Sequence, residues 1–204
     1  MNGQDYLDQI SSSVRPAKSK KRGIFSSKFL VVGLVGIICF ILIAIIGGIL
    51  GNNKSGEKNL SFLLALHIDN TAEVIQNYKG EIKSSNLRSI TASLSGVLSD
   101  TSNKLTSYLQ EKYDYNPKNV DKKITEQTTL EKDGLESELF EAKINGILDR
   151  IFTHKIKYEI SVIMAEESEI LDKTRDGSLT EILSTSYKSL SNLYDKFNDY
   201  SETN

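Results

Sequence analysis

The chain has 204 residues, of which 39% are hydrophobic and 25% are charged, and its formal net charge at pH 7 is −2. Its one cysteine, Cys39, excludes an internal disulfide and a zinc site made of cysteines, so packing alone must stabilise the folded part. Residues 1–28 carry six Lys or Arg against two Asp, whereas residues 51–204 carry 19 basic and 25 acidic residues. The acidic character of the larger part argues against nucleic-acid binding.

An uncharged apolar run of 22 residues, FLVVGLVGIICFILIAIIGGIL, occupies residues 29–50. As a helix it would extend for roughly 33 Å, enough to cross the hydrocarbon core of a bilayer. A basic cluster over residues 18–28 precedes it, and short flanks rich in Lys and Arg stay in the cytoplasm. The sequence therefore predicts a disordered cytoplasmic tail (1–28), a single transmembrane helix in the lipid bilayer (29–50) and an extracytoplasmic C-terminal part.

Two alternatives to an uncleaved anchor start from the same residues. A cleaved secretory signal also combines positive charge with an apolar stretch, but here the stretch is long and no A-x-A-like site follows it. Residues 20–25, KKRGIF, resemble the leader junction of type IV pilins, in which a basic residue and a glycine precede the cleavage point. This resemblance covers only the N-terminal part of the chain, and it implies a pilin-like subunit with a β-sheet in its globular domain. It fails at Lys28, where pilins typically carry Glu.

After a linker over residues 51–56, amphipathic helices follow one another, separated by glycines and by one Asn-Pro step. The first helix is predicted over residues 57–79 and the second over residues 84–112, each with an apolar stripe at intervals of three and four. The apolar side of the first helix contains Leu60, Leu64, His67, Ile68, Ile75 and Tyr78. The second helix also carries many Ser and Thr residues, which we interpret as a small polar face.

A break at Pro117 starts a short helix, predicted over residues 117–132, which has few apolar positions. Gly134 then separates it from a long periodic segment, residues 135–173, which is one helix or two. The apolar positions of this segment are Leu139, Phe140, Ile144, Ile147, Leu148, Ile151, Tyr158, Val162 and Ile170.

The last helix is the best specified, because Ser178 and Glu181 have the spacing of a capping box at its start. It carries a heptad seam with one polar interruption, and such a seam needs a partner. The seam consists of Leu179, Leu183, Ser186, Leu190, Leu193, Phe197 and Tyr200.

Together these elements predict an all-α protein with one N-terminal transmembrane helix followed by an antiparallel bundle of about four to five helices. The bundle domain is predicted over residues 57–200, and residues 201–204 are a frayed tail. An elongated coiled coil is the competing geometry, but the stripes are broader than two residues in seven, which favours a bundle.

Residues that could carry chemistry are few. His67 and His154 lie near apolar-stripe positions without another ligand at helical spacing, and we interpret them as packing residues rather than as a metal-binding or pH-sensitive pair. Glu166, Glu167 and Glu169 are interpreted as a solvated face. No phosphate-binding loop, nucleophile elbow or HExxH motif is present. The sequence therefore predicts no enzyme, no cofactor and no catalytic, cofactor-binding or metal-binding residue.

The expected function is a structural or protein-interaction role at the cell membrane, with a protein partner or self-association through the helical domain. The alternative is a ligand-binding sensory module that acts through a separate partner, by analogy with the bundles of bacterial chemoreceptors, although 28 inner residues cannot house an output domain. A ligand-binding bundle should hold a cavity with convergent polar groups, whereas an interaction module should expose an apolar seam.

Overall fold

The computed structural model describes residues 54–203, and it describes side chains for residues 56–201. The predicted cytoplasmic tail, the predicted transmembrane helix at residues 29–50, the start of the linker and Asn204 lie outside the described residues. Within residues 54–203, none of the helices combines the length and the apolar character needed to span a bilayer. The second half of the predicted linker is helical, because the first described helix begins at Lys54.

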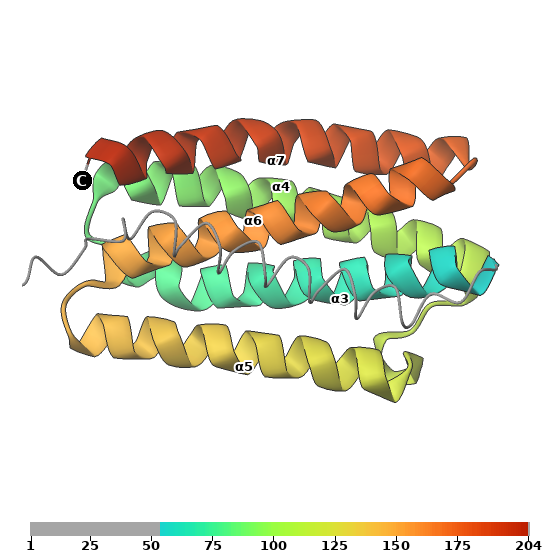
Figure 1. Ribbon diagram of the computed structural model, residues 1–204, viewed down its shortest axis with the longest axis horizontal. Coiled ribbons are helices and arrows are strands. Elements are labelled where there is room, and N and C mark those ends of the chain that lie inside the picture. Colours follow the sequence, from blue (N-terminus) through green and yellow to red (C-terminus); the bar gives the residue numbers. More distant parts are fainter. Residues whose placement is uncertain (1–53, 204) are drawn as a thin grey trace, which may run out of the picture. The chain divides into compact units, whose positions relative to one another are not determined.

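Five α-helices and two short 3₁₀ turns make up residues 54–203, with no strand among them. Consecutive α-helices run in opposite directions (Figure 1), so the predicted all-α helical bundle is confirmed for this part of the chain. The helices are α3 (Lys54–Tyr78), α4 (Ser85–Tyr113), α5 (Lys122–Ile144), α6 (Leu148–Lys173) and α7 (Gly177–Thr203), and the turns are Lys79–Glu81 and Pro117–Asn119.

Four of the helices enclose the core, and the fifth lies on their outside. Helix α3 packs against α4, α5 and α6, while α7 packs against α4 and α6. Thus α3, α4, α7 and α6 surround a common apolar interior, and α5 covers the side formed by α3 and α6 (Figure 1). The central position of α3 explains why residues 60–65 are all buried, since neighbouring helices contact it on several sides.

The break between α5 and α6 is not where the sequence predicted it. Gly134 lies inside α5, where glycine costs only about 1 kcal/mol relative to alanine. The chain reverses instead at Gly146, whose φ of 72° is in the left-handed region that favours glycine. The N–H of Gly146 donates to the carbonyl of Lys143 (3.1 Å), and the N–H of Ile147 donates to that of Ala142 (2.9 Å). This Schellman motif ends α5 and turns the chain into α6.

The start of α7 also differs from the predicted capping box. The Oδ1 of Asp176 accepts a hydrogen bond from the N–H of Leu179 (3.1 Å), so Asp176 is the N-cap. Ser178 lies inside the helix. The predicted heptad seam of α7 is confirmed, because all seven of its side chains are buried. Since α7 packs against α4 and α6, these helices of the same chain are the partners of that seam.

Candidate functional site

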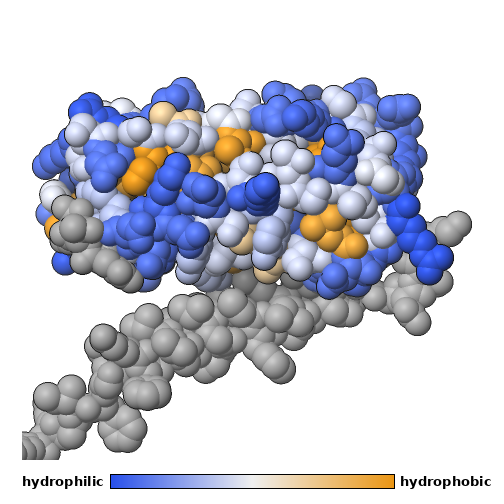
Figure 2. Space-filling view, turned by 90° about the horizontal axis from the view of Figure 1, so that it is seen from above, coloured by the Kyte–Doolittle hydropathy of each residue, from blue (hydrophilic) through white to orange (hydrophobic). Residues whose placement is uncertain are grey.

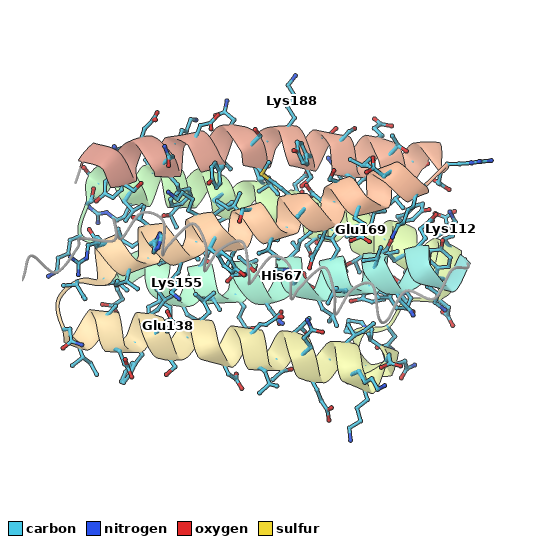
Figure 3. All side chains as sticks on the ribbon, viewed as in Figure 1. His67, Lys112, Glu138, Lys155, Glu169 and Lys188 are labelled. Carbon is cyan, nitrogen blue, oxygen red and sulfur yellow. The ribbon has the colours of Figure 1, made fainter. Side chains whose placement is uncertain are left out.

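A buried histidine joins α3 to two carboxylates of α6. His67 is 6% exposed and lies where α3 faces α6 (Figure 3). Its Nε2 lies 2.8 Å from Oε2 of Glu159, and its Nδ1 lies 3.1 Å from Oε2 of Glu166. The two glutamates are seven residues apart, two turns of helix, and therefore share one face of α6. As an imidazolium, His67 can donate one hydrogen bond to each carboxylate.

The surroundings of His67 favour its charged form. Burial acts to lower its pKa, but the charge of Glu166 and the hydrogen bonds to Glu159 and Glu166 outweigh it, and the pKa rises well above the usual 6.5. From α5, Glu131 adds a third carboxyl group to this cluster. Glu131 is itself exposed, but partial desolvation and the negative charges of Glu166 and Glu159 raise its pKa, against the opposing effects of Gln127, which donates to its Oε1 (3.1 Å), and of His67.

The cluster is suited to holding charge and protons rather than a metal ion. Both ring nitrogens of His67 already face carboxylates, so neither has a lone pair available for a cation. Among the described residues, no group of three or more His, Cys, Asp or Glu side chains is placed to hold a metal. The arrangement is an ion-pair network between α3 and α6, with α5 lying over it.

Next to this network, Glu167 is a carboxyl group without a hydrogen-bond partner. Its side chain is completely buried, and neither of its oxygens is in hydrogen-bonding geometry with another described group. Burial raises its pKa to about 8, with a further contribution from the charge of Glu166, while the Ser186 hydroxyl acts in the opposite direction. Ser186 itself accepts a hydrogen bond from Thr101 (3.0 Å). Thus α4, α6 and α7 share a buried polar layer, and the raised pKa of Glu167 favours its protonated form at neutral pH.

The histidines and glutamates considered in the sequence occupy different environments in the structure. His154 is exposed and is not part of the His67 cluster, while His67 is an ionic residue rather than a packing residue. The interpretation of the glutamates as a solvated face was wrong for Glu166 and Glu167, which are buried. The same interpretation was partly right for Glu169, which is half-buried and forms an ion pair with Lys173 (2.6 Å).

A signal for the buried glutamates was present in the sequence. The apolar stripe of α6 includes Ile156, Ile160, Ile163 and Ile170, all completely buried. Glu159 and Glu166 follow Ile156 and Ile163 by three residues, and Glu167 follows Ile163 by four. All three glutamates therefore lie on the same face of α6 as the apolar stripe. An interpretation based on the spacing of the apolar residues, rather than on the charge of the glutamates, would have placed these glutamates inside the bundle.

The outer side of α5 exposes large apolar side chains. Leu130 is 72% exposed, Phe140 56% and Ile144 68%, and Ile147 in the following turn is 38% exposed. The last three were expected in an apolar stripe. The buried side of α5 is formed instead by Ile124, Thr128, Leu135, Leu139 and Ala142. The face seen from the side of α7 is different, since it is mostly hydrophilic with a few separate apolar patches (Figure 2).

The molecular surface also has hollows between helices. One of about 400 Å³ lies between α4 and α7 and is bordered by small and hydroxyl-bearing residues, including Ser93, Gly96, Thr185 and Ser189. A second, of about 520 Å³, lies where the α5–α6 turn meets the segment between α3 and α4 and is lined by charged side chains.

Comparison of the chain with protein-family models, with curated proteins and with solved structures gives no significant match.

Proposed function

We propose that the chain is a single-pass membrane protein, with its N-terminus in the cytoplasm and its helical bundle outside, that serves a structural or protein-interaction role. The apolar run at residues 29–50 and the basic cluster before it support the anchor and its orientation. Only three residues separate this run from Lys54, where α3 begins, so the bundle follows directly on the proposed anchor.

The observation that carries the interaction role is the exposed apolar side of α5. Leu130, Phe140 and Ile144 face water on a helix that already buries its opposite side against α3 and α6. Covering such side chains gains about 25 cal/mol per Å² of apolar surface, which favours association with another protein surface. The polar groups of the His67 cluster, by contrast, contact each other inside the bundle.

The orientation can be tested with single cysteines in a Cys39→Ala background. In intact cells, a membrane-impermeant maleimide should label Lys188→Cys on α7, whereas it should label Ser12→Cys in the tail only after permeabilisation. The reverse pattern would contradict the orientation. Recovery of the chain in the soluble fraction would contradict the anchor.

The interaction role is tested by chemical crosslinking and mass spectrometry on the same cells. Crosslinks from the bundle to another protein or to a second copy are expected. If all crosslinks stay within one chain, the ligand-binding alternative is favoured. One observation supports that alternative: the hollow between α4 and α7, where several hydroxyls lie near the buried Thr101–Ser186 hydrogen bond.

A further inference from the structure

One line of exposed residues on the outside of α5 follows a heptad pattern. Their positions advance in steps of three and four along the outside of the helix, the spacing by which two helices pack side by side. We call them the outer seam: Leu130, Asp133, Ser137, Phe140 and Ile144, continued by Ile147 in the Schellman turn. All are exposed, and four of the six are large and apolar.

We propose that the outer seam binds the outer seam of a second copy of this chain, with the two α5 helices antiparallel. This rests on the interaction role proposed above and names its partner. A two-fold axis between Ser137 and Phe140 makes the seam self-complementary. Within α5 the contacting pairs, each formed twice, are Ser137 with Phe140 and Asp133 with Ile144. Leu130 lies opposite the Schellman turn of the second copy.

Side-chain size supports this register. Phe140 of one copy meets Ser137 of the other, so the largest side chain of the seam faces a small one. One turn before Ser137, Gly134 also leaves space, since a Cβ added there would meet nothing within 4 Å. An aromatic side chain can therefore enter between the two helices.

Charge favours the antiparallel direction over the parallel one. In a parallel pair, Asp133 would face Asp133 of the second copy, and Glu136 would lie beside Glu141 of the second copy. Like charges would then be in contact. In the antiparallel pair, Glu136 lies beside Lys143 of the second copy, and this contact occurs twice. Both side chains already have partners within the chain, Asn77 for Glu136 and Glu81 for Lys143, and they lie at the edges of the seam. In the antiparallel pair, the Glu136–Lys143 contact between copies adds to these contacts within each chain.

The pairing has a consequence for anchored chains. Helices α3 and α5 run in the same direction (Figure 1), so an antiparallel α5 pair places the two Lys54 residues at opposite ends. Two anchored chains meet in this way when their membranes face each other.

Cysteine crosslinking distinguishes the two directions. Full-length chains with Cys39→Ala and either Asp133→Cys or Ile144→Cys, carrying different tags, are purified in detergent, mixed and oxidised. A disulfide requires Cα atoms about 4.4–6.8 Å apart. In the antiparallel register residue 133 faces residue 144 of the other copy, whereas two residues 144 are separated by about 16 Å along the helix. We expect the mixed crosslink to dominate. Crosslinks between like positions, or none, would overturn the proposal.

A charge swap and a remote cysteine complete the experiment. Lys143→Glu should lower the yield of the mixed crosslink several-fold, and adding Glu136→Lys to the same chain should restore it, because the contact between copies is then reversed rather than lost. Lys188→Cys should not crosslink to Ile144→Cys, since Lys188 points away from the bundle on α7, across the core from α5 (Figure 3). An unchanged yield in Lys143→Glu would contradict the register. The maleimide labelling of Lys188→Cys reports on topology independently, so loss of the crosslink with normal labelling refutes only the α5 pairing.

Discussion

Replacing the buried carboxyl group of Glu167 by an amide should change how the stability of the bundle depends on pH. The pKa of Glu167 is about 8 in the folded chain, against an ordinary value of 4.5, so the folded state retains a proton that the unfolded chain releases. This contribution is fully present below pH 4.5 and is lost as the pH rises through 8. Since a tenfold change in proton affinity corresponds to about 1.4 kcal/mol, the free energy of unfolding falls by about 3 kcal/mol between pH 4.5 and pH 7.

Glu167→Gln keeps the shape of the side chain but cannot ionise. We expect the free energy of unfolding of the wild-type chain to fall with increasing pH and that of the variant to stay nearly level. The assay is urea unfolding of the full-length chain in detergent micelles, followed by far-UV circular dichroism at several pH values from 5 to 8.

Controls separate Glu167 from its neighbours. Glu169→Gln, on the half-buried side of the same helix, should keep the wild-type slope. His67 has a raised pKa, so its contribution is complete below pH 6.5 and disappears only at higher pH. The pKa of Glu131 is also raised, and Glu131→Gln measures its share of the slope between pH 5 and 6.5. A wild-type slope that is flat in this range, or one that persists unchanged in Glu167→Gln, would refute the reasoning.

Five further substitutions, at three places in the bundle, test the local structure by the same unfolding assay. Changing His67 to Leu leaves two carboxylates facing each other without their cation, and should destabilise the bundle by about 3 kcal/mol at neutral pH; a loss below 1 kcal/mol would mean that the network contributes little. Gly134→Ala should stabilise by about 1 kcal/mol because the site is helical and open, whereas Gly146→Ala should destabilise by about 1 kcal/mol because of its positive φ; the same sign for both would contradict the assigned break. Asp176→Ala should cost about 1 kcal/mol through loss of the N-cap and of the ion pair with Lys112 (2.8 Å), while Ser178→Ala should be nearly neutral; the opposite ranking would support the capping box.

The helices were predictable where apolar spacing alone determines them. The α7 seam is an example, since Leu183, Leu190 and Phe197 are buried as their heptad spacing predicts. The reversal between α5 and α6 was not predictable from glycine content, because Gly134 and Gly146 look alike in sequence. What distinguishes them is the positive φ at Gly146, where the chain reverses between α5 and α6.

The candidate site was harder to predict because its members come from separate helices. His67 and Glu166 are 99 residues apart, and nothing near either in the sequence marks the other. The charge of Glu166 suggested exposure, whereas the position of this residue on the α6 stripe determined burial. The exposed side of α5 was missed for a related reason: Leu139 and Phe140 are adjacent apolar residues, and only packing against α3 and α6 decides which of them is buried.

The position of α5 outside a closed four-helix core also has a kinetic meaning. The attachment of α5 includes exposed or half-exposed ion pairs, such as Lys132 with Glu73 on α3 (2.6 Å) and Lys155 with Glu138 between α6 and α5. Because α3, α4, α6 and α7 also contact one another around a shared interior, we expect α5 to open as a separate cooperative unit, which removes its four residues Ile124, Leu135, Leu139 and Ala142 from the common apolar cluster. Amide hydrogen exchange should then be faster in α5 than in α3, and each opening would admit water to the His67 cluster while the rest of the bundle stays folded.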